Sequence, residues 1–300
     1  MTSGKKQRIV NVASVPHRSP FRYPGGKTWL VPYVRTWLRS LSFKPALFVE
    51  PFVGGGIIGL TVGFESLSDR VLMVELDENV AAVWMVLFSD DAGVLAERVR
   101  RFEMTEDRLR KELESPTDSV LQHAFCTILR NRVSHGGIMA HGSGFVRNGE
   151  NGKGLRSRWY PETLFRRMMD IAGIRERFDF FHADGISFMG KYIDCSDMVF
   201  FIDPPYTVGG VGKRAGKRLY QHHELDHNHL FDVVAEIRGD FLMTYDNDPE
   251  VREMAERRGF SVRPVRMKNT HHAEMTELLI GKNLEWVDSV FPVFGKTLFS

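Results

Sequence analysis

An apolar run, a cluster of glycines and a second apolar run occupy residues 46–59, and this segment constrains the fold more than any other. Ala46–Glu50 is expected to be a strand, Gly54–Gly56 a turn, and Ile57–Gly59 the start of a helix. Glycines suit such a turn because the absence of a Cβ lets the backbone approach a neighbouring group closely. A strand, a glycine turn and a helix in this order are typical of α/β domains that bind ligands at the ends of parallel strands.

The rest of the chain repeats this alternation. From Phe21 onward, short apolar runs alternate with amphipathic segments, and several runs are apolar throughout, as expected of strands covered by helices on both faces. The expected strands are Ala46–Glu50, Arg70–Leu76, Phe178–His182, Met198–Ile202, Asp240–Tyr245, Phe260–Met267 and Thr276–Gly281. The sequence therefore predicts an α/β fold with a Rossmann-like sheet.

A stretch of different character lies between the second and third expected strands. Charged helical sequence covers Asp91–Glu114, and a further helix is expected to begin with Ser115 as its N-cap and Pro116 at its first position. A glycine-rich basic segment, Gly136–Trp159, follows. We therefore predict three parts: a flexible arm (1–20), a sheet domain in two pieces (21–88 and 176–300), and a mainly helical insert (89–175).

Composition restricts the class of protein. With 43% hydrophobic and 26% charged residues, the 300-residue chain suits a globular protein with one large core. No apolar run is long enough to cross a bilayer, and Met1–Pro20 lacks the apolar core of a secretory signal. Cys126 and Cys195 are too few and too far apart for a disulfide framework, so we expect a cytoplasmic protein.

The glycine cluster fits two cofactor patterns. The dinucleotide fingerprint G-x-G-x-x-G is satisfied by Gly54, Gly56 and Gly59. The acid-x-Phe-x-Gly-x-Gly pattern of S-adenosyl-L-methionine (AdoMet) sites is satisfied by Glu50, Phe52, Gly54 and Gly56. Both cofactors use an acid at the end of the next strand, here Glu75, to bind ribose hydroxyls. Glu50 favours the cationic sulfonium over a pyrophosphate, but the loop alone leaves both cofactors open.

The expected strand Met198–Ile202 runs directly into the tetrapeptide Asp203-Pro204-Pro205-Tyr206. The two prolines fix an extended turn without N–H donors, at the strand end where α/β sheets bind ligands. The Asp203 carboxylate and the Pro204 carbonyl could accept hydrogen bonds from an exocyclic amino group and so activate its nitrogen as a nucleophile. Tyr206 would stack on a base flipped out of a duplex. This chemistry requires neither a metal nor a covalent nucleophile.

Four of these motifs, taken in order, resemble the Dam-type (D12 class) DNA adenine-N6 methyltransferases, with the motif order of the α group. The matching segments are Phe21–Lys27, Val49–Gly56, the strand ending at Glu75, and Asp203–Tyr206, with Glu277–Gly281 resembling the closing strand. The resemblance implies a Rossmann-like AdoMet-dependent methyltransferase sheet whose insert recognises DNA. It also implies an AdoMet pocket lined by Tyr23, Gly26 and Lys27, with Glu75 on the ribose, Asp184 on the cofactor's adenine and Asp203 touching both cofactor and target base.

The insert carries the positive charge expected of a DNA contact. Residues 130–167 contain eight Lys or Arg side chains against two acids, a net charge of +6. We predict DNA contacts from Arg130, Asn131, Arg132, Arg147, Lys153, Arg156 and Arg158. After Asn131-Arg132 the sequence departs from Dam, so recognition of GATC is not expected. A second basic stretch, Gly209–Arg218, either contacts phosphates through Lys213, Arg214 and Lys217 or is a solvated surface loop.

Other functions explain fewer of these features. An amino-methyltransferase acting on cytosine N4, RNA or a protein glutamine would share the fold, but such enzymes more often have Ser or Asn in place of Asp203. An NAD-dependent oxidoreductase would explain the glycine cluster but not the tetrapeptide. A DNA-binding module without activity would not need the complete set of motif residues.

The expected partner is double-stranded DNA. A separately encoded restriction endonuclease would be compatible with this function, and the chain itself is expected to be a monomer.

One further pattern, His223-Glu-Leu-Asp-His227, reads as the H-E-x-x-H of zinc proteases. That motif works only within one helix, where both histidines share a face. Asp226 reads better as an N-cap, with a helix beginning at His227, so we predict no metal site here.

Overall fold

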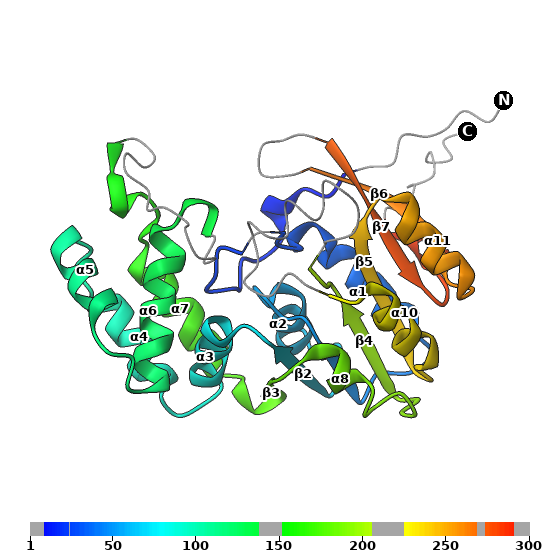
Figure 1. The fold of residues 1–300 in the computed structure, drawn as a ribbon, viewed down its shortest axis with the longest axis horizontal. Coiled ribbons are helices and arrows are strands. Elements are labelled where there is room, and N and C mark those ends of the chain that lie inside the picture. Colours follow the sequence, from blue (N-terminus) through cyan, green and yellow to red (C-terminus); the bar gives the residue numbers. More distant parts are fainter. Residues whose placement is uncertain (1–8, 24, 138–151, 206–224, 269–273, 291–300) are drawn as a thin grey trace, which may run out of the picture.

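A seven-stranded sheet with helices on both faces forms the larger part of the protein (Figure 1). The structure is a computed structural model that describes residues 9–23, 25–137, 152–205, 225–268 and 274–290. The strand order is β3-β2-β1-β4-β5-β7-β6. The strands are β1 (Leu47–Glu50), β2 (Arg70–Glu75), β3 (Phe178–His182), β4 (Met198–Ile202), β5 (Asp240–Asp246), β6 (Ser261–Lys268) and β7 (Glu274–Gly281).

Strands β1 to β5 are parallel, and β7 runs antiparallel to both of its neighbours. The chain moves outward from β1 to β2 and β3, and then returns to place β4 on the other side of β1. The point where the order reverses lies between β1 and β4, where open α/β sheets bind ligands. The predicted Rossmann-like α/β fold is confirmed, and each strand end lies within two residues of its predicted position.

Two apolar cores, one on each face of the sheet, explain why β4 is apolar throughout. Val199 and Phe201 belong to the core with α1, α2 and α3, whereas Phe200 and Ile202 belong to the core with α8, α10 and α11. The helices are α1 (Val31–Ser40), α2 (Ile57–Phe64), α3 (Glu78–Leu87), α4 (Ala92–Arg101), α5 (Glu106–Glu114), α6 (Val120–Val133), α7 (Pro161–Ala172), α8 (Gly185–Met189), α10 (His227–Glu236) and α11 (Pro249–Arg257), with short 3-10 helices at Val12–Ser14, Thr28–Leu30, His135–Gly137, Gly154–Arg158, Arg175–Arg177 and Glu285–Ser289.

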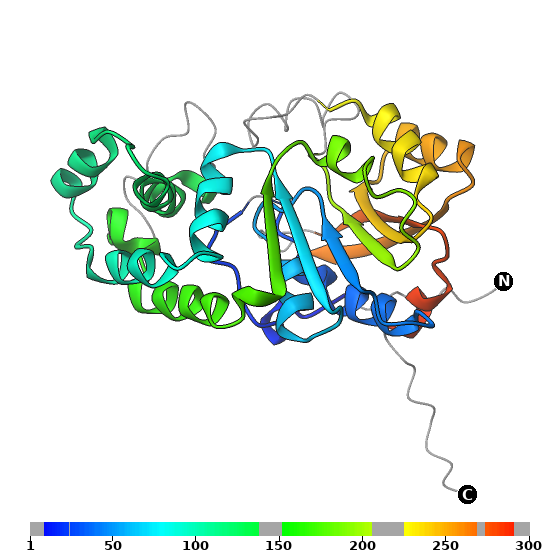
Figure 2. The same cartoon turned by 90° about the horizontal axis from the view of Figure 1, so that it is seen from below.

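Helices α4 to α7 form a group beside the β3 edge of the sheet (Figures 1 and 2). Helix α3 connects this group to the sheet, because it packs against β2 and β3 and also against α6. The apolar side chains of α4, α6 and α7 belong to the same core as those of α1 and α2. The three-part division of the chain stays a prediction.

The predicted start of the helix after Ser115 is wrong. Ser115 ends α5 instead: its N–H bonds to the carbonyl of Glu112 (3.3 Å) and its hydroxyl to that of Lys111 (2.7 Å). Helix α6 begins at Val120, where the hydroxyl of Ser119 accepts from the N–H of Gln122 (3.1 Å). Ser115 thus ends α5, and Ser119, four residues later, caps α6.

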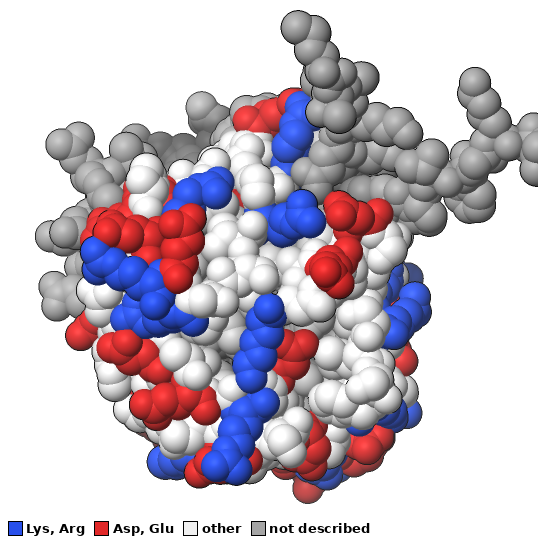
Figure 3. Space-filling model, turned by 90° about the vertical axis from the view of Figure 1, so that its right-hand side faces the viewer, with Lys and Arg blue, Asp and Glu red and all other residues white. Residues whose placement is uncertain are grey.

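The face at the β6 end of the sheet, over α10 and α11, carries acidic and basic side chains side by side (Figure 3). On this face Arg258 pairs with Asp232 (2.5 Å).

Within the described ranges, no single helix is long and apolar enough to cross a membrane. Of the helices in these ranges, only α3 and α4 taken together, bent by 108°, pass by length and composition.

Candidate active site

Acidic side chains stand at the carboxyl ends of three neighbouring parallel strands. Glu50 ends β1, Glu75 ends β2, and Asp203 directly follows β4. The strand order places all three side by side at the carboxyl ends of the central strands, next to the point where the order reverses. Glu50 and Glu75 are buried, and the side chain of Asp203 is 21% exposed. The structure therefore brings together the acids that the sequence assigned to the cofactor and to catalysis.

Glu50 is bonded to the first turn of α2. The N–H of Gly59 donates to Oε2 of Glu50 (2.8 Å), and a Cβ on residue 59 would overlap that oxygen. Burial raises the pKa of Glu50 well above its ordinary value, and the nearby charges of Asp203 and Glu75 raise it further. The carboxyl group of Glu50 thus accepts a hydrogen bond from a backbone N–H in the first turn of α2, so that this N–H is already paired.

Glu75 fixes the other end of the glycine loop. Its Oε2 accepts from the N–H of Gly54 (2.8 Å), and its Oε1 accepts from the N–H groups of Leu76 (2.9 Å) and Asp77 (2.8 Å). Burial raises the pKa of Glu75 to about 7, although these backbone donors favour the ionised form. The glycine loop is therefore tied to the end of β2 by a carboxyl group that titrates near neutral pH.

Two aromatic rings fill the space that side chains on the loop would need. A Cβ on Gly54 would lie 2.6 Å from Cε1 of Tyr23, and one on Gly56 would lie 2.7 Å from the ring of Trp84. Both glycines also have positive φ (44° and 64°). The indole N–H of Trp84 donates to the carbonyl of Gly54 (3.1 Å). The loop thus needs glycine because these two rings pack against it.

Lys27 joins the N-terminal motif to the tetrapeptide. Its side chain is 5% exposed, and Nζ donates to the carbonyl of Gly25 (2.9 Å). The same Nζ lies 3.2 Å from Oδ1 of Asp203 and 3.8 Å from Oε2 of Glu277, on β7. A cation between two carboxylates limits the cost of burying all three charges.

Asp203 is also held from β5. The hydroxyl of Thr244, a fully buried residue, donates to Oδ1 of Asp203 (2.8 Å). Pro204 is buried and Pro205 is half-buried, so the turn is anchored against the sheet. Tyr206 lies outside the described residues, and its stacking on a base stays a prediction.

A buried tyrosine follows Thr244 on β5. The hydroxyl of Tyr245 lies 2.8 Å from Nδ1 of His227, the first residue of α10. Burial raises the pKa of Tyr245 well above its ordinary value, and the charge of Asp203 adds to this effect. The predicted helix start at His227 is confirmed, because Oδ1 of Asp226 accepts from the N–H of His229 (3.0 Å). His227 therefore begins a helix, while His223 lies outside the described residues.

Three further residues assigned to the cofactor make local contacts in the structure. Asp184 caps α8, where its Oδ1 accepts from the N–H of Ser187 (2.8 Å). Phe52 is half-buried and packs on the core under α8. Gly26 is exposed, and its N–H donates to the carbonyl of Tyr23 (3.2 Å).

Two residues assigned to DNA are inside the protein instead. Asn131 is fully buried and bonds to the backbone of Arg22, and Arg132, 5% exposed, donates to the carbonyl of Pro20. The expectation that both contact DNA is wrong for this structure, because neither side chain reaches the surface. Burial also lowers the pKa of Arg132 to about 10.

The other basic residues divide into described and undescribed positions. Arg130, Lys153 and Arg156 are exposed, and Arg158 is half-buried. Nε of Arg156 also donates to the carbonyl of Met104 (3.0 Å). Those outside the described residues are Arg147, Lys213, Arg214 and Lys217.

Sequence reasoning did not find two residues of the site. Thr244 lies within an expected strand and Trp84 within an apolar helix, so each looked like a core residue. The third contact of Lys27, Glu277, was recognised only as part of a closing strand. A polar side chain within the otherwise apolar run Phe241–Tyr245 is the signal for Thr244.

No protein-family model matches the chain, and no curated protein matches it. Solved structures that match in shape include a candidate RNA methyltransferase from Pyrococcus horikoshii (11% identity, 90% of this chain and 93% of that one, TM-score 0.40). Others are the rRNA methyltransferase AviRa from Streptomyces viridochromogenes (13%, 87% and 86%, TM-score 0.38) and a methyltransferase from Geobacter sulfurreducens (13%, 85% and 77%, TM-score 0.36). Likenesses this distant carry no information on substrate.

Proposed function

We propose that the protein is an AdoMet-dependent methyltransferase that modifies N6 of a flipped-out adenine in DNA. The observation that carries this proposal is the placement of Asp203. Its carboxylate is held by Lys27 and Thr244 at the end of β4, beside a glycine loop whose backbone donors are bonded to carboxyl groups.

The choice of cofactor follows from those backbone donors. A dinucleotide would bring its pyrophosphate to the glycine loop and the N-terminus of α2. Here the N–H groups of Gly54 and Gly59 are already bonded to Glu75 and Glu50. An anion would have to displace these carboxyl groups, whereas a cationic sulfonium nearby would favour their ionised form and be stabilised by it. The residues present therefore fit AdoMet and not NAD.

The residues that would hold AdoMet are those around the loop. They are Tyr23, Glu50, Phe52, Gly54, Gly56, Glu75 and Asp184, with Asp203 between cofactor and target. When bound, this cofactor supplies a methyl group attached to a positively charged sulfur. Glu75 offers a carboxyl group to ribose hydroxyls, which are hydrogen-bond donors.

The tetrapeptide accounts for the activation of an amino group. The nitrogen of an exocyclic amino group is a poor nucleophile because its lone pair is delocalised into the ring. The carboxylate of Asp203 and the carbonyl of Pro204 accept its two N–H bonds and orient the lone pair for attack. Lys27 and Thr244 fix Oδ1 of Asp203, so the acceptor is in place before the substrate arrives. The carboxylate can also accept the proton that the nitrogen loses after transfer.

Adenine in DNA is the substrate that the whole set of motifs favours. Asp in the first position of the tetrapeptide favours adenine N6 over cytosine N4 and glutamine. Exposed cations on the helical group, Arg130, Lys153 and Arg156, suit phosphate contacts. The resemblance to the Dam-type family supports the same substrate.

The experiment is a transfer panel with AdoMet carrying a labelled methyl group. Unmethylated DNA, total RNA and a glutamine-containing protein extract are each offered to the wild-type protein and to Asp203→Ala. Label in DNA with the wild type alone supports the proposal. Label in RNA or protein would instead assign another amino-methyltransferase, and binding of NAD in place of AdoMet by calorimetry would refute the cofactor.

A further inference from the structure

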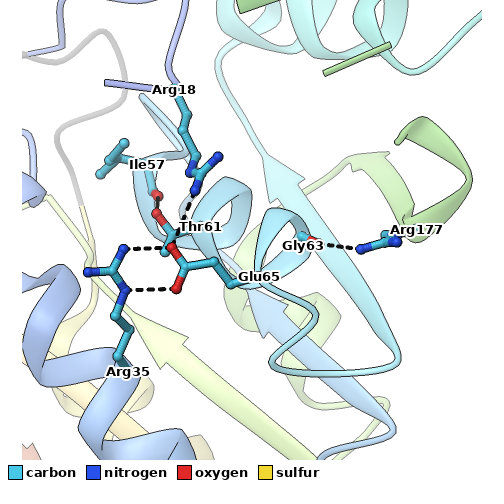
Figure 4. A network of polar contacts seen from close by, with 7 residues as sticks. All are labelled: Arg18, Arg35, Ile57, Thr61, Gly63, Glu65 and Arg177. Carbon is cyan, nitrogen blue, oxygen red and sulfur yellow. Dashed lines mark hydrogen bonds and ion pairs between the residues drawn. The ribbon is translucent and has the colours of Figure 1, made fainter. Parts of the chain in front are cut away.

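A short segment before the first strand, Arg18–Tyr23, connects three parts of the structure, and we call it the strap. At its start, a guanidinium nitrogen of Arg18 lies 3.3 Å from Oε1 of Glu65, at the C-terminal end of α2 (Figure 4). Glu65 also receives two hydrogen bonds from Arg35 on α1 (2.7 and 2.6 Å). The first residue of the strap is therefore fixed to the helix that follows the glycine loop.

The strap then contacts the glycine loop itself. The hydroxyl of Ser19 donates to the carbonyl of Gly55 (2.5 Å). At the other end of the strap, Tyr23 packs on the loop, and Cβ atoms on Gly54 and Gly55 would lie 2.6 and 2.9 Å from its side chain. Two strap side chains thus set the position of the loop to which we assign AdoMet.

The backbone of the strap is bonded to the helical group. Asn131, on α6, accepts from the N–H of Arg22 (2.9 Å) and donates to the carbonyl of the same residue (2.8 Å). Its amide also donates to the carbonyl of Gly137 (3.1 Å). Both backbone groups of Arg22, the neighbour of Tyr23, are therefore bonded to one buried side chain.

Two arginines extend this attachment toward the start of the strap. Arg132, also on α6, donates to the carbonyl of Pro20, and Arg167, on α7, donates to the carbonyl of Ser19 (3.0 Å). Burial lowers the pKa of both guanidinium groups. Charged donors that point at single carbonyls in a poorly solvated region make strong hydrogen bonds.

We propose that Asn131 and Arg167 are positioning residues for AdoMet, which act through the strap on the glycine loop. The helical group would hold the backbone of the strap, and the side chains of Ser19 and Tyr23 would hold the loop. The proposal rests on the proposed function, because it takes AdoMet to be the ligand of that loop. It assigns the helical group a part in cofactor binding in addition to any contact with DNA.

Arg167→Gln is the main test, because Arg167 is half-buried and its loss should leave the fold intact. Arg166→Gln is the matched control: it removes the same charge from the adjacent residue, which is exposed and, among the described residues, bonds to the carbonyl of Glu162 within α7. We expect the Kd for AdoMet, measured by calorimetry, to rise about tenfold in Arg167→Gln, as the loss of one charged hydrogen bond implies. In Arg166→Gln it should stay at the wild-type value, and Arg167→Lys, which keeps a charged donor, should recover most of the affinity.

A double-mutant cycle separates action through the strap from a general loss of structure. In the Tyr23→Ala background, Arg167→Gln should weaken AdoMet binding by a smaller factor than in the wild type, because one of the two strap side chains that hold the loop is already lost. Asn131→Leu should behave like Arg167→Gln if it folds, and Thr127→Val, a buried change on the same helix, is its control.

Equal Kd values for the wild type, Arg167→Gln and Arg166→Gln would overturn the strap proposal, as would full additivity with Tyr23→Ala. If the wild type does not bind AdoMet, the proposed function fails, and amide hydrogen exchange then tests the strap. Arg167→Gln should speed exchange at Gly55 and Gly56, and Arg166→Gln should not. Unchanged exchange in Arg167→Gln would refute the strap without reference to any ligand.

Discussion

Nζ of Lys27 lies 3.2 Å from Oδ1 of Asp203, and this ion pair joins a residue before the first strand to the turn after the fourth. The same nitrogen lies 3.8 Å from Oε2 of Glu277 on the last strand. Three segments far apart in sequence therefore meet at one buried cation. We infer from this pair that Lys27 neutralises and orients the carboxylate of Asp203, which we assign to the target amino group.

Replacing Lys27 with methionine should destabilise the protein strongly. The change leaves Asp203 and the buried Glu277 without their shared cation, and removing one partner of a buried pair costs about 3–5 kcal/mol. The loss in the free energy of unfolding is measured by urea denaturation. The control is Lys44→Met, because Lys44 pairs with Asp69 (2.6 Å) where both side chains are exposed, and such a pair contributes less than about 1 kcal/mol. Equal losses in the two variants would contradict the role of Lys27.

Replacing Thr244 with valine should slow transfer while leaving the fold nearly intact. The variant keeps the shape of the side chain but removes the hydrogen bond to Oδ1 of Asp203, so kcat should fall about tenfold while the KM for AdoMet changes little. Thr127→Val is the control, since the hydroxyl of this buried residue has no hydrogen-bond partner among the described residues. An unchanged kcat in Thr244→Val would remove Thr244 from the site.

Replacing Gly59 with alanine should weaken AdoMet binding although alanine favours helices. The added Cβ would overlap Oε2 of Glu50 and push that carboxyl group away from the first turn of α2. Calorimetry should show a Kd at least about tenfold higher, equivalent to about 1.4 kcal/mol. Gly93→Ala on α4 is matched, because no described residue outside its own helix lies within 4 Å of the new Cβ, and its helix should gain up to about 1 kcal/mol. A wild-type Kd in Gly59→Ala would argue against Glu50 as part of the cofactor site.

The stability of the protein should depend on the ionisation of Glu75. Its pKa is raised from 4.5 to about 7 by burial, so between these pH values the folded protein holds a proton that the unfolded chain has released. The free energy of unfolding therefore falls as pH rises through this window, by about 3 kcal/mol for such a shift. Urea unfolding from pH 4.5 to 7.5 should show this fall in the wild type and a flatter profile in Glu75→Gln. Parallel profiles would mean that Glu75 keeps its ordinary pKa in the fold.

The sheet was largely predictable because its pattern is local. Met198–Ile202 is apolar at every position, and the structure gives the reason: successive residues enter cores on opposite faces. The order of Glu50, Glu75 and Asp203 along the chain also predicted their meeting, because parallel strands bring their carboxyl ends to one edge.

The sequence could not predict contacts made with distant backbone. Asn131 and Arg132 stand beside a basic glycine-rich segment, and such residues are usually exposed. Their partners, Arg22 and Pro20, lie more than a hundred residues upstream, and no local pattern links the two segments. The reason differs for Ser115, where two serines four residues apart both have the features of an N-cap and the helix begins after the second, Ser119.

The central claim is tested most directly by identifying the nucleoside that receives the methyl group. DNA lacking methylated bases is incubated with the protein and labelled AdoMet, digested to nucleosides, and separated by liquid chromatography with mass detection. The account predicts that the label is found in N6-methyldeoxyadenosine with the wild-type protein and is absent with Asp203→Ala. Label in N4-methyldeoxycytidine, or in N6-methyldeoxyadenosine at the wild-type level with Asp203→Ala, would contradict it.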